Sequence, residues 1–351
     1  MTRHFRLSTL VLVLFFSGCA HVTATSVIAP SSHPLAYAVN ARYPVGGEGG
    51  WDYLSIDPSR DHLFVSRGDR VEIMDTNSGR VVATLPGTDG VHGIAIAPGL
   101  GRGYTSNGKA DSVTEFDLDT LKRVRDIPLG GHRPDAIVFD AYARHVFTFN
   151  ARSSDASVID PVNGKEITRI PLPGKPEFGV TDDQGHIYVN IEDKSELTEI
   201  DSNKLVVLQT WPLSGCEEPS GLAIDVAHMR LFSVCQNRTM AITDGRSGRQ
   251  VASVPIDDGP DAARFDAQLG LAFSSNGESG TLTIVHEDDP DHFRVVQSLA
   301  TQHSARTMAI DPATHRLYLS AATFQAQPAG AQGRPPMVPG SFTIVEVGRA
   351  Q

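Results

Sequence analysis

Apolar and polar residues along this 351-residue chain alternate in short runs, and the runs recur at intervals of about 42 residues. Period-two alternation between clusters of Gly, Asn, Asp and Pro predicts β-strands, and no long stretch has the 3.6-residue period of an amphipathic helix. Seven segments share the same start, a small turn followed by an apolar strand. They are WDYLSIDP (51–58), VHGIAIAP (91–98), PDAIVFDA (134–141), PEFGVTDD (176–183), PSGLAIDV (219–226), PDAARFDA (260–267) and ARTMAIDP (305–312).

Each repeat has room for three further strands. In the first repeat these are the aromatic and β-branched run HLFVS (62–66), the alternating run VEIMD (71–75) and VVATLP (81–86). A unit of four antiparallel strands in this length range is typical of a β-propeller blade. We therefore predict an all-β chain in which residues 34–348 form a single seven-bladed β-propeller domain.

The last repeat supplies only three strands, which leaves its outermost position vacant. An unassigned apolar segment, PLAYAVNARYPV (34–45), precedes the first repeat. Pairing this segment with the C-terminal blade would close the ring and leave no free sheet edge at either end of the chain. We therefore expect residues 34–45 to be the outer strand of that blade.

Residues 1–18 have the pattern of an export signal. Arg3 and Arg6 precede the apolar run LVLVLFF (10–16), and two small residues follow it. The run is too short to span a membrane stably as a helix. Residues 19–33 are small and polar and are expected to form a tether.

The segment Phe16-Ser17-Gly18-Cys19 resembles the lipobox of bacterial lipoproteins. The resemblance implies lipidation of Cys19 and an anchor on the periplasmic side of a bacterial membrane. Ala20 replaces the Asp that would favour the inner membrane in that class, which implies the outer membrane. The alternative is an ordinary signal peptide in which Cys19 is incidental.

Cys216 and Cys235 remain once Cys19 is assigned to the anchor. An even pair of cysteines in an exported protein predicts a disulfide, here within the fifth repeat. Closing a loop of roughly 20 residues contributes on the order of 3 kcal/mol. Two buried free thiols are the alternative.

The charge balance and the absence of several motifs argue against some classes of function. The chain has 41 acidic and 30 basic side chains, for a formal net charge of −11, which argues against broad nucleic-acid binding but leaves a local basic patch open. The sequence contains no Cys-x-x-Cys-His, no Gly-x-Ser-x-Gly and no phosphate-binding glycine loop. We expect a monomer with no cofactor, except that a divalent cation remains open.

Three repeats end their second strand in a similar way: Tyr104-Thr105-Ser106-Asn107, Phe147-Thr148-Phe149-Asn150 and Phe273-Ser274-Ser275-Asn276. These ends resemble the Tyr-Val-Thr-Asn motif of the YncE-like, or YVTN-repeat, family of bacterial seven-bladed propellers, and the resemblance covers essentially all of 34–348. It implies the propeller fold and an exported location. Because relatives by fold include binding scaffolds and lactonases, it does not select an activity. Asn107-Gly108 and Asn276-Gly277 also suit a hairpin turn with positive φ.

A candidate site follows from the second residue of each repeat. In a propeller the first strand of every blade starts at the mouth of the central channel, so these residues should form a ring there. Neighbouring loops add His132, Arg133 and His303, and the long loop 323–340 should lie on the same face. The ring consists of Asp52, His92, Asp135, Glu177, Ser220, Asp261 and Arg306. The ends of the second strands add Asn107, Asn150, Asn190, Gln236 and Asn276.

Two functions from different classes fit this ring. The favoured one is a non-enzymatic propeller that binds a protein or a small molecule at the mouth. The alternative is a lactonase-type hydrolase, in which a divalent cation held by Asp52, Asp135, Glu177 and Asp261 activates a water molecule. For any single Asp, a bond to its own turn backbone is a third explanation. The segment 288–292 is expected to be an exposed turn.

Overall fold

The computed structural model describes residue 2, residues 36–326 and residues 335–350. The expected signal, Cys19, the tether and the centre of the 323–340 loop lie outside this part of the chain. Within it the chain forms 27 strands and two short 3-10 turns, Pro98–Leu100 and Glu192–Lys194, so the all-β prediction is confirmed. Among these residues no helix is long and apolar enough to cross a membrane.

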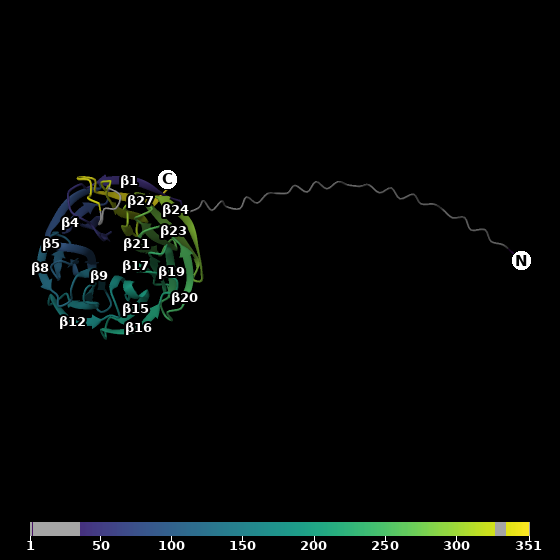
Figure 1. Ribbon diagram of the computed structural model, residues 1–351, viewed down its shortest axis with the longest axis horizontal. Coiled ribbons are helices and arrows are strands. Elements are labelled where there is room, and N and C mark those ends of the chain that lie inside the picture. Colours follow the sequence, from purple (N-terminus) through teal and green to yellow (C-terminus); the bar gives the residue numbers. More distant parts are fainter. Residues whose placement is uncertain (1, 3–35, 327–334, 351) are drawn as a thin grey trace. The chain divides into compact units, whose positions relative to one another are not determined.

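The strands form five antiparallel sheets of four strands and one of seven, each joining strands that are consecutive along the chain except where β1 is added. Innermost strands such as β9, β17 and β21 lie towards a common centre, and β8, β12, β16 and β20 lie at the rim (Figure 1). The seven-stranded sheet contains β2 (Leu54–Asp57), β3 (His62–Ser66), β4 (Gly68–Asp75), β5 (Arg80–Ala97), β6 (Arg102–Asn107), β7 (Ser112–Asp117) and β8 (Arg123–Pro128). The next two sheets contain β9 (Pro134–Asp140), β10 (His145–Asn150), β11 (Asp155–Asp160) and β12 (Lys165–Pro171), then β13 (Pro176–Thr181), β14 (His186–Ile191), β15 (Glu196–Asp201) and β16 (Val206–Pro212). The last three contain β17 (Pro219–Asp225), β18 (Arg230–Cys235), β19 (Thr239–Asp244) and β20 (Gln250–Pro255), then β21 (Pro260–Asp266), β22 (Leu271–Asn276), β23 (Thr281–Asp289) and β24 (His292–Ala300), and finally β25 (Thr307–Asp311), β26 (Arg316–Ala321), β27 (Thr343–Arg349) and β1 (Tyr37–Pro44).

The seven-stranded sheet is two blades joined by one continuous strand. The first part of β5, 80–86, pairs with β4, and its last part, 91–97, pairs with β6. Gly87 and Gly90, both with positive φ, lie between the two parts and let the strand pass from the rim of one blade to the centre of the next. With β5 shared in this way, the described strands make seven sets of four.

The N-terminal strand completes the C-terminal blade, as predicted. β1 pairs antiparallel with β27, from Tyr37 opposite Arg349 to Pro44 opposite Thr343. Arg42 of β1 also donates hydrogen bonds to the carbonyl of Thr301 and the side chain of Gln302, beyond the end of β24 in the preceding blade. The first strand therefore ties together the last two blades.

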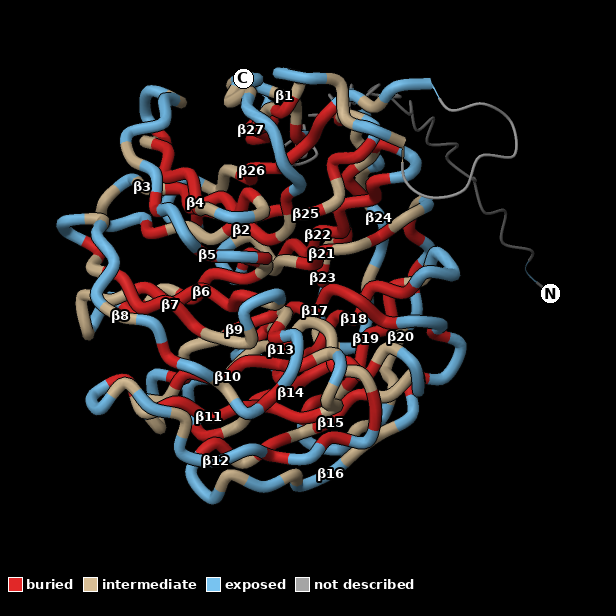
Figure 2. Tube along the Cα trace, turned by 60° about the vertical axis from the view of Figure 1, so that its left-hand side comes forward, coloured by how far each residue is buried: buried red, intermediate tan, exposed pale blue. Residues whose placement is uncertain are grey.

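The apolar core lies between neighbouring blades. Phe147 and Phe149 of β10, for example, pack with Ile187 and Val189 of β14 in the next blade. Exposed residues follow the rim strands β8, β12 and β16 (Figure 2). Because each blade buries its faces against two others, the aromatic and β-branched second strand of every repeat is buried from its second residue onwards.

The asparagines that end the second strands are buried, and their side chains act as clamps, which means here that they hydrogen-bond to neighbouring strands. Asn107 accepts a hydrogen bond from Thr105 Oγ1 at 2.8 Å and donates one to Thr114 Oγ1 on β7 at 2.9 Å. Asn276 repeats this arrangement with Ser274 and Thr283. The prediction that these amides extend the mouth is therefore wrong for Asn107, Asn150, Asn190 and Asn276, which are all buried. Three of them are hydrogen-bonded within their own blades, and Asn190 donates to the carbonyl of Ser220 in the next blade.

The turns after Asn107 and Asn276 do not have positive φ at the Asn-Gly pairs, where it was expected. Positive φ occurs later in these turns, at Asp111 and Gly280.

The disulfide between Cys216 and Cys235 is present, with a Cα–Cα distance of 5.3 Å. It joins the approach to β17 to the end of β18, so the alternative of two free thiols is excluded.

Deletion of residues 34–45 tests whether ring closure controls stability. Without β1, β27 loses its hydrogen-bonding partner and becomes an open edge. We expect the melting temperature to fall by at least about 10 °C, measured by calorimetry. The control is a chain that lacks only residues 1–33. Equal melting temperatures for the two truncations would contradict the role of β1.

Candidate functional site

The seven ring residues line one cavity of about 880 Å³ at the mouth of the channel. Each lies at or just before the start of the innermost strand of a different blade. In five blades a register shift marks the position. His92, for instance, lies between Val91, which pairs with Asn107, and Ile94, which pairs with Thr105. Such a bulge turns a strand locally and re-aims its side chain, which places the second residue of the repeat in the mouth.

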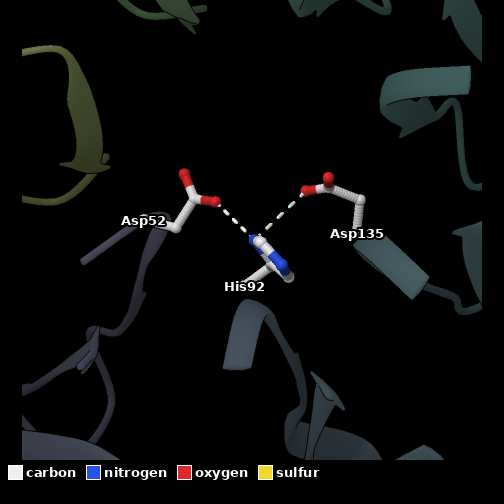
Figure 3. A group of neighbouring side chains, drawn as sticks. All are labelled: Asp52, His92 and Asp135. Carbon is white, nitrogen blue, oxygen red and sulfur yellow. Dashed lines mark hydrogen bonds and ion pairs between the residues drawn. The ribbon is translucent and has the colours of Figure 1, made fainter. Parts of the chain in front are cut away.

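Three of the ring residues form a compact group. His92 Nδ1 lies 2.7 Å from Asp52 Oδ2 and 3.7 Å from Asp135 Oδ1 (Figure 3). One ligand atom from each residue lies within 4.8 Å of the others, so the group could hold a metal ion. Burial disfavours a charged imidazole, but the hydrogen bond with Asp52 and the charge of Asp135 outweigh it and raise the pKa of His92.

The adjacent carboxyl groups are poorly compensated. Burial raises the pKa of Asp135 to about 6 in spite of the opposing charge of His92. Burial, with a further contribution from the charge of Asp135, raises the pKa of Glu177 to about 8. Lys175 Nζ lies 2.7 Å from Glu177 Oε1 and also contacts Glu192, so it is shared between two acids. This side of the ring therefore favours a proton or another cation.

Arg306 holds the opposite side of the ring. Its Nη1 lies 2.6 Å from Asp261 Oδ2, and its Nη2 lies 3.6 Å from Asp52 Oδ1. Nη2 also donates a hydrogen bond to the carbonyl of Trp51. The side chain thus links the sixth, seventh and first blades. Two of the four predicted metal ligands, Glu177 and Asp261, are thus paired with basic residues. Among the described residues of the mouth, the group that could hold a metal ion contains the other two, Asp52 and Asp135, together with His92, which was not predicted as a metal ligand.

Ser220 has a structural contact. Its side chain is buried, and Oγ donates a hydrogen bond to the carbonyl of Pro260 in the next blade at 3.2 Å. The hydroxyl therefore holds two blades together. Of the loop residues, Arg133 and Gln236 line the mouth cavity. His132 pairs with Asp111 at 2.9 Å in an exposed position, and His303 lines a neighbouring cavity.

The charged residues that line the mouth and were not predicted from the sequence include Lys109, Arg152, Lys175 and Glu192. Lys175 stands two positions before the ring residue of its repeat, as the predicted Arg133 does. Lys109, Arg152 and Glu192 each stand two positions after the asparagine that ends the second strand. Alignment of the repeats against one another would have revealed both positions, because equivalent positions of a blade face the same way.

A tilted pair of aromatic rings lies beside the mouth cavity. The ring of Tyr53 lies 5.1 Å from that of Phe178, and the guanidinium of Arg264 lies 4.8 Å from the Phe178 centroid. Tyr53 lines both the mouth cavity and a cavity of about 370 Å³ between the innermost strands. Burial raises the pKa of Tyr53, and the charges of Asp135 and Glu177 add to the effect, so its hydroxyl stays neutral beneath the acidic ring.

The described ends of the 323–340 loop lie beside the mouth. Phe324 forms an isolated bridge with Met337, and its ring lies 5.8 Å from that of Trp51. Trp51 itself lines the mouth cavity. The expected position of this loop on the mouth face is therefore reproduced by its two ends, whereas 327–334 lie outside the described residues.

Comparisons with known proteins identify the fold. A chain of hydrazine synthase from Kuenenia stuttgartiensis has a similar structure, with a TM-score of 0.68 and 15% sequence identity over 77% of this chain and 92% of that chain. No family model and no curated protein matches the sequence. The matching chains of solved structures number 1829, and a fold shared so widely does not select an activity. This protein is a β-propeller.

Glu177→Gln tests the carboxyl group that shares Lys175 with Glu192 and has a raised pKa. Because the folded-state pKa is raised to about 8, the folded protein binds more protons than the unfolded chain between about pH 5 and pH 8, and stability falls as the pH rises. Each tenfold change in proton affinity is worth about 1.4 kcal/mol, so the loss should be on the order of 3 kcal/mol. Urea unfolding of Glu177→Gln in chelator should show a much flatter pH dependence.

The exposed carboxyl group of Glu278 provides the matched control. Glu278→Gln should keep the pH dependence of the unmodified protein. The charge assignment is wrong if Glu177→Gln and Glu278→Gln give the same slope of unfolding free energy against pH.

Proposed function

We propose that this protein is an exported, lipid-anchored propeller of the YncE-like family that binds a ligand or partner at the mouth of its channel and acts there as a monomer. The observation that carries the proposal is the convergence of one residue from each blade on a single cavity of about 880 Å³. Convergence from seven repeats gives a rigid site, because each side chain is held by a separate blade. The strand ends that resemble the Tyr-Val-Thr-Asn motif support the family assignment.

The charge layout describes the ligand. Asp52, Asp135 and Glu177 place acidic groups on one side of the inner ring, where raised pKa values at the latter two indicate a deficit of positive charge. Lys109 and Arg152 line the same cavity from the surrounding loops. The acidic ring and the basic loops together suit a small polar ligand with charges of both signs. Such a ligand would present a cationic group, or a bound divalent cation, to the ring and an anionic group to the loops.

A metal-dependent hydrolase is the second candidate, and one observation favours it. Asp52, His92 and Asp135 offer three ligand atoms within 4.8 Å, which leaves coordination positions for water and substrate. A divalent cation held there would lower the pKa of a bound water molecule. Glu177 lines the same cavity, and its pKa is raised to about 8 in the metal-free protein, so it is the candidate proton donor to a leaving group.

Asp135→Asn tests the cation site, and a lactone assay beside it separates the ligand-binding protein from the hydrolase. Thermal shift with Mn²⁺, Ca²⁺ and Zn²⁺ should show binding to the unmodified protein that weakens at least about tenfold in this variant, because the amide removes the charge and keeps the shape. Sugar lactones and short oligonucleotides are screened in the same assay. Lactone hydrolysis that requires the cation would establish the hydrolase, and binding without turnover would establish the ligand-binding protein.

Asp111→Asn is the control, because Asp111 lines the same cavity but lies outside the three-residue group. It should leave cation binding unchanged. A ligand that binds equally well to Asp135→Asn, His92→Ala and Arg306→Gln would place the functional surface elsewhere on the protein.

Cys19→Ser tests the anchor in cells. The lipobox-like segment supports cleavage before Cys19 and diacylation of the new N-terminus, since a single acyl chain gives only marginal membrane binding. Cell fractionation should find the unmodified protein in the outer-membrane fraction and Cys19→Ser in the soluble periplasm, while Ser17→Ala remains at the membrane. A soluble unmodified protein would refute the anchor.

A further inference from the structure

A second group of potential ligands joins the fifth and sixth blades. Asp225 ends β17, at the opposite end of that strand from Ser220, and His228 follows in the turn. His228 Nδ1 lies 2.7 Å from Asp225 Oδ2 and 2.8 Å from Glu287 Oε1, which belongs to β23 of the next blade. The three ligand atoms lie within 4.8 Å of one another.

The two carboxyl groups are more deeply buried than the imidazole. The Asp225 and Glu287 side chains are each 4% exposed, whereas that of His228 is 50% exposed. Among the described residues, Glu287 Oε2 has no hydrogen-bond donor. Burial, together with the charge of Asp225, raises the pKa of Glu287. A single imidazole nitrogen thus serves two buried carboxyl groups, and one carboxyl oxygen has no donor.

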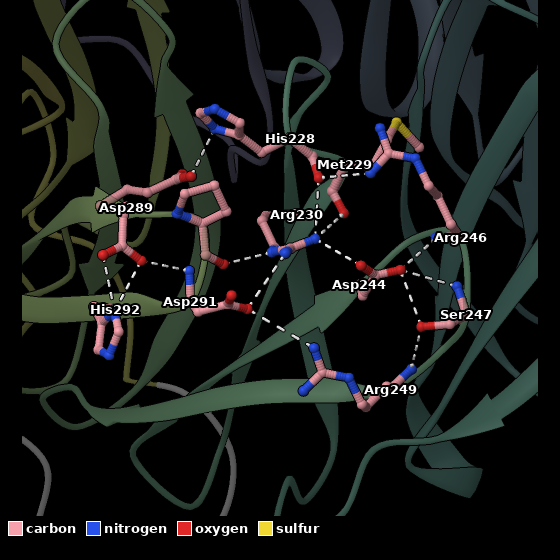
Figure 4. A network of polar contacts seen from close by, with 12 residues as sticks. His228, Met229, Arg230, Asp244, Arg246, Ser247, Arg249, Asp289, Asp291 and His292 are labelled. Atoms are coloured by element: carbon pink, nitrogen blue, oxygen red, sulfur yellow. Dashed lines mark hydrogen bonds and ion pairs between the residues drawn. The ribbon is translucent and has the colours of Figure 1, made fainter.

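Arg230 is a permanent cation whose charge acts on Glu287, but its hydrogen bonds go elsewhere. Nε donates to the carbonyl of Pro290, and Nη1 donates to Asp244 and to the carbonyls of His228 and Met229. Nη2 lies 3.5 Å from Asp291. Figure 4 shows this network around Arg230, together with the exposed pair of His292 and Asp289, which joins it through a hydrogen bond from the backbone N–H of Asp291 to Asp289. Arg230 therefore offers charge at a distance and no donor to Glu287.

The first repeat shows what this position requires. Arg60 stands three residues after Asp57, as His228 stands three residues after Asp225. Its guanidinium pairs with Asp57 at 2.8 Å and with Asp119 of the next blade at 2.6 Å. A permanent cation thus bridges the contact between the first and second blades, and an imidazole bridges the corresponding contact between the fifth and sixth.

We propose that Asp225, His228 and Glu287 bind a divalent transition-metal ion of the Zn²⁺ type, which ties the fifth blade to the sixth. Imidazole and carboxylate donors suit Zn²⁺, with bonds of roughly 2.0–2.2 Å. Tetrahedral ligands are then about 3.4 Å apart, so each carboxylate oxygen needs to move away from His228 Nδ1 by only about 0.7 Å. The ion takes the place of the proton on Nδ1, which is released to solvent through the exposed side of His228.

The test uses His92→Ala as the background, so that the mouth cannot contribute. Calorimetric titration with ZnCl₂ should find one ion per chain, and saturation should raise the melting temperature. Adding Glu287→Gln should weaken the affinity at least about tenfold, since loss of a ligand costs no less than loss of an outer-shell partner. Adding His228→Arg, which copies the first repeat, should abolish Zn²⁺ binding without lowering the melting temperature of the metal-free protein.

His292→Ala is the control, because His292 and Asp289 form an exposed pair close by. It should leave the titration unchanged. The proposal is overturned if the His92→Ala protein binds no Zn²⁺, if binding survives Glu287→Gln and His228→Arg, or if His292→Ala removes it. If His92→Ala does not fold, the same pairs of variants are compared in the unmodified chain, where His228→Arg must reduce the stoichiometry by one ion.

Discussion

The pairing of β1 with β27 is the contact on which the rest of the structure depends. A blade cannot bury its apolar faces alone, and each of the seven buries them against two neighbours. The arrangement is complete only when the last blade meets the first and its outer edge is paired. Residues from the two ends of the chain make that edge, from Tyr37 to Pro44 and from Thr343 to Arg349. Closure also brings the seven innermost strands to one centre.

Convergence of the innermost strands has an electrostatic consequence. Acidic side chains that would be solvated at the start of an isolated hairpin face one another across a narrow mouth. Burial and mutual repulsion raise the pKa of Asp135 to about 6 and that of Glu177 to about 8. Such carboxyl groups cost stability when ionised, and they are retained where a cation or a ligand compensates them. Ser220 differs from these acids, because its hydroxyl donates a hydrogen bond to the carbonyl of Pro260 in the neighbouring blade.

The opposite ends of the innermost strands have a different use. Their turns link one blade to the next, through Arg60 and Asp119 in the first repeat and through His228 and Glu287 in the fifth. Similar positions of the repeat thus carry different chemistry on a common backbone. The mouth gathers one residue from every blade into a single site, whereas each turn serves only the seam beside it. The geometry of the mouth therefore depends on the whole ring, and a seam contact can vary independently.

The periodicity of the sequence determined the strands, the closure by the N-terminal segment and the positions that meet at the mouth. These features follow from local patterning and from the count of strands, which a repeat makes explicit. The disulfide was predicted separately, from an even pair of cysteines in a chain with an export signal. The tertiary structure alone decided which charges pair. The grouping of His92 with Asp52 and Asp135, the sharing of Lys175 between Glu177 and Glu192, and the contact of His228 with Glu287 all join different repeats or different strands. The asparagines that end the second strands show the same point, because their residue type alone did not decide whether they face the channel mouth or form buried hydrogen bonds between strands. Only the packing of each blade, which buries Asn107 against Thr114, selected the clamp.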